Sequence, residues 1–209
     1  NKIKLNKYEF DNPPDGNKPA LLVDKSKAKS KEEIETTVSR GFRLTIPEVG
    51  WILITHNGDL VLNIYDKKSY QQEPKSMHIE TPNQVILNTT SASHLDLDII
   101  ASNVVLTGKS SAKLHSLKFH KSNPTNELFQ GLFIDEKSSF SCDNLLIENS
   151  LILLLGSLTI LGNLTVNNGL LFNMGNFIIS NQTEIRDVSY FFNGTRGVIS
   201  SKNSILINS

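Results

Sequence analysis

Histidine and aspartate recur at every second position in the stretch His94-Leu-Asp-Leu-Asp98. Alternate residues of a β-strand point to one face, so His94, Asp96 and Asp98 would lie side by side. Such a row could bind a metal ion, or its two carboxylates could share acid and base catalysis. The same pattern also fits a plain strand with Leu95 and Leu97 turned to a core and the polar row in solvent. We expect the solvent-facing arrangement, with no metal or cofactor, because no further clustered carboxylate supports a site.

A second group of polar residues follows shortly afterwards and is basic. Its members are Lys109, Lys113, His115, Lys118, His120 and Lys121. The last five are the candidate binding residues of the chain, since a cationic cluster could contact an anionic glycan or a lipid head group. A solvated strand face is the alternative interpretation of the same cluster. No residue is assigned a catalytic role, and the single cysteine, Cys142, is expected to be a small core residue.

Composition narrows the class of protein. The chain has 209 residues, of which 38% are hydrophobic and 20% charged, so a packed core is possible. Its formal net charge is zero, which argues against a nucleic-acid or membrane-surface binder driven by electrostatics. One cysteine excludes an internal disulfide. The longest apolar run, Leu151–Leu155, is far too short to span a bilayer.

The elements that must position these residues are organised around residues 144–181. Short apolar runs are separated there at close intervals by Gly or Asn, which suit strands of three to five residues joined by tight turns. One frame recurs: Asn, three mostly apolar residues, a variable residue, then Asn or Gly. The residues that we assign to this structural repeat are Asn103, Asn144, Asn163, Gly169, Gly175, Asn176 and Asn203. The starts of the frame are unevenly spaced, which would follow if the motif stood at more than one corner of a coil.

Short strands with Asn at the corners predict a right-handed parallel β-helix over residues 76–209, with about six to seven coils of roughly 20 residues. Stacking would place like aliphatic residues above one another and allow aligned Asn side chains to form hydrogen-bonded ladders. A β-sandwich of short strands is the alternative, although its strands alternate apolar and polar residues more cleanly. The fold class is therefore mainly β. The polar loop His120–Glu127 is the longest interruption between the expected coils.

Residues 1–75 follow a different pattern and predict a small α+β module, or a cap on the first coil. Ser30 and Glu33 form a capping box, so we expect one helix over Lys31–Arg40 that ends at Gly41. Asn57-Gly58 separates two strand-like runs and predicts a β-hairpin in an antiparallel sheet. Because residue 1 is Asn and the last frame runs to the final residue, we expect the sequence to be an internal piece of a longer protein.

The segment 162–180 resembles the haemagglutinin-type repeats of bacterial filamentous adhesins and contact-dependent inhibition exoproteins. Positions of the family frame are occupied by Gly162, Asn163, Leu164, Gly169, Asn173 and Gly175. Autotransporter passengers are similar in the same way. The resemblance implies a secreted or surface-exposed bacterial protein, elongated and non-catalytic, which acts as a stalk, an adhesive fibre or part of a toxin-delivery protein. Its partner would be a receptor or glycan on a host or neighbouring cell.

The leading hypothesis is thus a non-enzymatic segment of a large β-helical surface protein, which binds no nucleic acid and does not insert into a membrane. Two other classes stay open. The same architecture supports polysaccharide lyases and glycoside hydrolases, which need several acidic groups, or an acid with Arg or Lys, on one exposed sheet face. An intracellular scaffold that polymerises end to end through open coil edges is the third possibility.

Overall fold

The computed structural model describes residues 76–122, 130–180, 183–185, 188–201 and 205–207, together with the backbone of seven strands nearer the N-terminus. Side chains are described within 76–88, 93–122, 130–180 and 190–201. All of the described secondary structure is β-strand, so the mainly β class is confirmed. In the described part of the chain, no helix has the length and apolar character that crossing a membrane would require.

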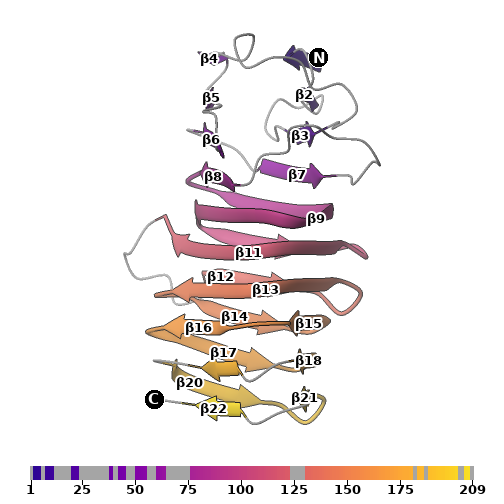
Figure 1. Ribbon diagram of the computed structural model, residues 1–209, viewed down its shortest axis with the longest axis vertical. Helices are drawn as coiled ribbons and strands as arrows, with labels where there is room; N and C mark the ends of the chain where they lie inside the picture. Colours follow the sequence, from indigo (N-terminus) through magenta and orange to yellow (C-terminus); the bar gives the residue numbers. More distant parts are fainter. Residues whose placement is uncertain are drawn as a thin grey trace.

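The strands stack into a parallel β-solenoid whose coils run down the long axis of the molecule (Figure 1). Each coil has three sides. The first side consists of the start of β9 (Gln84–Ala101), β10 (Asn103–Leu106), β12 (Gly131–Ile134), β14 (Leu151–Leu154), β17 (Gly169–Asn173) and β20 (Val188–Asn193).

The second and third sides are built in the same way. The second side consists of the middle of β9, the starts of β11 (Ser111–Lys121) and β13 (Ser139–Glu148), then β15 (Ser157–Ile160), β18 (Asn176–Ile179) and β21 (Val198–Ser201). The third side consists of β8 (Ser76–Glu80), the ends of β9, β11 and β13, then β16 (Leu164–Asn167), β19 (Thr183–Ile185) and β22 (Ile205–Ile207).

Five successive parallel pairings connect the six strands of the first side, so the described stack makes about five complete coils. This is slightly below the expected six to seven, since these pairings span only Gln84 to Asn193 and one of the coils is longer than roughly 20 residues. From residue 76 onward, equivalent positions lie 18 to 22 residues apart in the other coils, but Gly131 lies 28 residues after its neighbour Asn103. The expected polar loop near His120 falls within this longer coil, and residues 123–129 lie outside the described part of the chain.

Aliphatic and aromatic side chains fill the interior in columns along the axis. On the third side Leu97, Leu117, Leu145 and Leu164 stack in register, and each is at most 1% exposed. The prediction of stacked like residues is therefore confirmed for this column. Burying a Leu side chain contributes about 1.5–3 kcal/mol, and one coil alone could not bury these residues. The columns thus explain why separate three- to five-residue strands hold together.

The uneven spacing of the Asn frame has a structural explanation. Asn144 and Asn163 stand at equivalent corners before the third side, Asn176 stands before the second side, and Asn103 stands before the first side. The motif therefore occupies all three corners, as the uneven spacing suggested. Asn203 lies outside the described residues.

Near the N-terminus, antiparallel strands precede the solenoid and then join it. The pairs are β1 (Lys2–Leu5) with β2 (Tyr8–Asp11), β2 with β3 (Ala20–Val23), β4 (Val38–Ser39) with β5 (Phe42–Thr45), and β5 with β6 (Gly50–Thr55). Most of the expected helix 31–40 lies outside the described residues, but Val38–Ser39 form a strand, so the helix prediction is wrong at these two positions. Pairing with β5 supplies their hydrogen bonds instead.

The predicted hairpin around Asn57-Gly58 is also wrong. The two strands beside it, β6 and β7 (Leu60–Ile64), pair with other elements in the described ladders. β6 stacks in parallel on β8, and β7 stacks in parallel on the start of β9. The two strands therefore continue different sides of the solenoid, and the parallel ladder extends N-terminal to the expected boundary at residue 75.

Candidate functional site

The outside of the third side carries paired imidazole and carboxylate groups on adjacent strands. We call this set the histidine–carboxylate ladder; its members are His78, Glu80, Asp96, Asp98, His115, His120, Asp143 and Glu148. The alternation of each strand turns these residues outward, while Met77, Ile79, Leu97 and Ile99 point into the core. The parallel register then brings groups from β8, β9, β11 and β13 next to one another.

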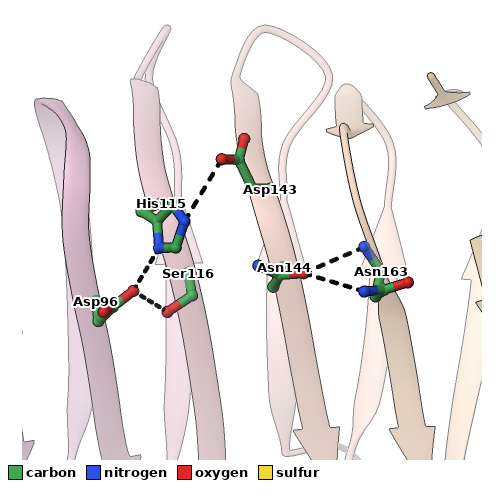
Figure 2. Close-up of polar contacts among 6 residues, drawn as sticks. All are labelled: Asp96, His115, Ser116, Asp143, Asn144 and Asn163. Carbon is green, nitrogen blue, oxygen red and sulfur yellow. Dashed lines mark hydrogen bonds and ion pairs between the residues drawn. The ribbon is translucent and has the colours of Figure 1, made fainter. Parts of the chain in front are cut away.

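The best-defined part of the ladder surrounds His115 (Figure 2). Its Nδ1 lies 2.7 Å from Oδ1 of Asp96, and its Nε2 lies 3.7 Å from Oδ2 of Asp143. The hydroxyl of Ser116 donates to the same Asp96 oxygen over 2.6 Å. The imidazole therefore lies between two carboxylates that come from the coils on either side of its own.

His78 makes an equivalent bridge closer to the N-terminus. Its Nδ1 lies 2.9 Å from Asp98 on the next coil, and its Nε2 lies 2.8 Å from Glu80 on its own strand. His120 continues the ladder on the other side, with its Nδ1 2.7 Å from Oε2 of Glu148. The doubly protonated imidazolium is the form that donates from both nitrogens, so His78 is best satisfied when charged.

These contacts shift the protonation equilibria in a consistent direction. Partial burial of His78 favours its neutral form, but the hydrogen bonds to Glu80 and Asp98 outweigh this effect and raise its pKa above 6.5. The hydrogen bond to Asp96 raises the pKa of His115. Desolvation of Asp96 works against its ionisation, yet the bonds from Ser116 and His115 lower the pKa of its carboxyl group.

The geometry argues for cohesion between coils and against an activated nucleophile. In a catalytic Ser-His-Asp arrangement the histidine accepts the serine proton. Here Ser116 donates to Asp96, whose lowered pKa makes it a weak base. Among the described residues, no group of three or more His, Cys, Asp or Glu is placed to hold a metal ion. Each short polar contact described above joins two side chains of the ladder or its serine.

The first predicted row, His94, Asp96 and Asp98, lies on the outside of β9 as the solvent-facing interpretation expected. Leu95 and Leu97 are each 1% exposed and belong to the core. Asp96 and Asp98 do not share one site, because Asp96 bonds to His115 on the following coil and Asp98 bonds to His78 on the preceding coil.

The predicted basic cluster is divided between two sides. Lys113 is paired with Ser141 on the second side, whereas Lys118 and His120 lie on the third side next to Leu146 and Glu148. His115 and His120 both contact carboxylates, so two of the five candidates serve the ladder. Lys113 and Lys118 are exposed, and Lys121 is half-buried at the end of β11.

Several predicted structural residues do connect adjacent coils. Asn144 Oδ1 accepts hydrogen bonds from the backbone and side chain of Asn163, at 3.3 and 3.4 Å (Figure 2). Asn103 Oδ1 accepts from the backbone N–H of Gly131 at 3.0 Å. These contacts confirm the predicted bonding between aligned Asn side chains for Asn144 and Asn163. Asn176 is exposed at the start of β18.

The glycines of the repeat stand where backbones meet closely. A Cβ built on Gly175 would lie 2.2 Å from the carbonyl oxygen of Gly156, and one on Gly169 would lie 2.6 Å from that of Ser150. Cys142 is buried, and burial raises the pKa of its thiol far above the ordinary value, so it remains an unreactive core residue.

Two features were missed in the sequence. The partners that the histidines find on neighbouring coils become visible only when the coils are aligned, because Asp98 follows His78 by 20 residues and Asp143 follows His115 by 28. The second feature is a row of outward apolar residues on the first side, described below. Runs such as Leu151–Leu155 could have predicted this row, because a strand that is apolar at consecutive positions has apolar residues on both of its faces.

Comparisons of this chain with protein-family models, with curated proteins and with solved structures found no match.

Proposed function

We propose that this chain is a non-catalytic segment of a large secreted or surface-exposed bacterial β-helical protein. Its role is to extend or display a binding region away from the cell as a stalk, adhesin or toxin-display fibre. The proposal rests on one observation: the histidines and carboxylates of the ladder contact one another across neighbouring coils. Groups engaged in this way stabilise a rod, and within the described side chains we see no converging set of acids outside these pairs.

Two further observations support a rod-like role. Interior columns such as Leu97, Leu117, Leu145 and Leu164 continue through successive coils, which gives the continuous core that an extension element needs. The sequence of residues 162–180 also resembles repeats of bacterial filamentous exoproteins. We propose residues 1–75 as the more specialised region, and a receptor or glycan on a host or neighbouring cell as the partner.

A polysaccharide lyase or glycoside hydrolase is the second candidate, because Asp96 and Asp143 flank one imidazole on an exposed side. The two functions are separated by incubating the full chain with a panel of acidic and neutral polysaccharides. New reducing ends and unsaturated products are then quantified alongside binding to the same glycans and to intact cells. We expect that the wild type releases no cleavage product from any of these glycans, whether or not it binds them.

The control variants make this experiment specific. Asp96→Asn removes one ladder carboxylate, and Asp135→Asn changes an exposed corner carboxylate that bonds to backbone N–H groups instead. Product formation by the wild type and by Asp135→Asn, but not by Asp96→Asn, would overturn the non-catalytic proposal in favour of glycan cleavage.

A further inference from the structure

One row of apolar residues runs along the outside of the first side from β9 to β20. Six residues in register form a single outward column, which we call the apolar column: Ile86, Val105, Phe133, Leu153, Phe172 and Phe192. Their neighbours along the strands, such as Val104, Leu132 and Ile152, are fully buried, so alternation directs the column itself outward. A core function therefore does not explain these residues.

Further apolar residues widen the column towards the C-terminal end of the described stack. Tyr190 is 51% exposed, Phe192 is 41% exposed and Met174 is 42% exposed. The ring of Phe172 lies 5.8 Å from that of Tyr190 and 6.1 Å from that of Phe192, measured between centroids. Aromatic and Met side chains are the types enriched at the centres of protein interfaces.

We propose that the apolar column is a self-association surface, on which a second copy of this chain packs face to face in antiparallel orientation. Charge supports this choice of partner. None of the outward positions described on the first side is charged, so a charged partner face would lose hydration there without gaining an ion pair. A second copy presents an equally uncharged column with the same spacing between strands.

The size gradient along the column supports the antiparallel orientation. The column begins with the aliphatic Ile86 and Val105 and ends with the aromatic Phe172 and Phe192. An isologous two-fold arrangement places the aromatic end of one copy on the aliphatic end of the other. Phe172 then faces Val105 of the second copy. A parallel arrangement would instead oppose large residues to large ones and leave a gap at the other end.

The available area predicts that the association is weak. Six strands about 4.8 Å apart and about 13 Å long cover roughly 300 Å² on each copy. Two such faces together bury about half of the 1,200 Å² or more that a stable, specific interface buries. We therefore expect a dimer that forms with rising concentration, in the range typical of transient contacts.

The first test is sedimentation velocity of the full chain over a concentration series. The variant Leu153→Thr/Phe172→Thr removes two adjacent apolar residues of the column and replaces them with β-branched Thr, which suits a strand. Ile178→Thr is the matched control, because Ile178 is 37% exposed on the second side of the same coil as Phe172. We expect the double variant to associate about tenfold more weakly than the wild type and the control. A wild type that stays monomeric, or a double variant that associates like the wild type, would overturn the proposal.

The second test does not depend on the folding of the Thr variant. Chains carrying Val105→Cys and Phe172→Cys are mixed and oxidised; the native Cys142 is buried and contributes no cross-link. The antiparallel arrangement predicts that the mixed disulfide dominates over both homodimers. If Phe172→Cys homodimers dominate, the antiparallel arrangement is wrong. If the mixed disulfide forms no more readily than disulfides between exposed control cysteines on the second side, the apolar column is not the contact surface.

Discussion

The first and third sides of the solenoid share one interior but have opposite exteriors. On the first side the outward residues are uncharged and apolar, as in Phe133 and Leu153. On the third side many of them are imidazoles and carboxylates, as in His115 and Asp96. Inward residues are under the same constraint on both sides, because each must fill a column between two coils. The stacking of coils therefore constrains the inward residues of every side, whereas the outward residues can differ in chemistry from one side to another.

The two exteriors also hold adjacent coils together by different means. Outward contacts between coils on the third side are directional, with His78 and Asp98 2.9 Å apart. On the first side they are ring and aliphatic contacts such as Phe172 with Tyr190. Polar contacts between charged groups depend on protonation and are screened by salt, whereas apolar contacts do not depend on protonation. Stability measurements can therefore assign effects to one side or the other.

The largest expected effect comes from Gly131, where the first side has no space for a side chain. A Cβ at this position would lie 1.8 Å from the backbone oxygen of Leu151, an atom that cannot move without shifting β14. We expect Gly131→Ala to lower the free energy of unfolding by about 3 kcal/mol or more, measured by denaturant titration.

Gly108→Ala is the control for that substitution. A Cβ at Gly108 meets nothing within 4 Å, and the strain of its φ of +68° should cost only about 1–2 kcal/mol. Equal losses of stability in the two variants would show that the close approach of β12 and β14 at Gly131 does not limit stability.

Much of the fold could be predicted from the sequence because its signals are local. Breaks at Gly and Asn, together with short apolar runs, identified the parallel coil and its period of about 20 residues. The outward direction of Asp96 followed from strand alternation alone. The failed predictions, the hairpin at Asn57-Gly58 and the strand at Val38–Ser39, concern positions where pairing with distant strands overrides a local turn or capping signal.

The candidate site was less predictable for the same physical reason. His115 was identified as basic, but its partners Asp96 and Asp143 come from the coils on either side, and only an accurate register reveals them. One longer coil, in which Gly131 follows Asn103 by 28 residues, shifts all later positions. The basic cluster is divided for a different reason: β11 passes from the second side to the third at the register shift between Leu114 and Ser116, which residue spacing does not show.

A smaller effect is expected at the corner where the third side leads into the first. Asn149 and Asn168 adopt φ values of +50° and +49° on successive coils, and Asn168 Nδ2 donates to Asn149 Oδ1 over 3.0 Å. Asn168→Ala should cost about 1–2 kcal/mol, because Ala tolerates a left-handed conformation poorly. The measurement is the shift in denaturant midpoint at unchanged slope.

Asn168→Gly separates the two contributions at this corner. Glycine accepts the left-handed backbone but cannot donate to Asn149, so its loss relative to the wild type isolates the side-chain bond. We expect Asn168→Gly to be more stable than Asn168→Ala. The reverse order would mean that the left-handed backbone at Asn168 imposes no strain on Ala, because both variants lack the side-chain donor.

The smallest effect is the pH dependence of the third side. The pKa values of His78 and His115 are raised in the folded chain, so their contribution to stability is full below the ordinary value of 6.5 and is lost as pH rises through the folded pKa. Asp96 acts in the opposite sense: its pKa is lowered, so its contribution is present above 3.8 and lost as pH falls. Stability from the ladder should therefore be greatest between these two values.

Solvent screening limits the size of this effect, since the His115 side chain is 45% exposed and that of Asp96 is 52% exposed. We expect a decrease of at most about 1 kcal/mol between about pH 5.5 and about pH 8.5, measured by denaturant unfolding. The variant His78→Gln/His115→Gln should flatten this slope, and Phe133→Leu on the first side should preserve it. The opposite result would be a pH dependence that survives in the histidine variant and disappears in Phe133→Leu. It would show that the pH-dependent stability does not come from the third side.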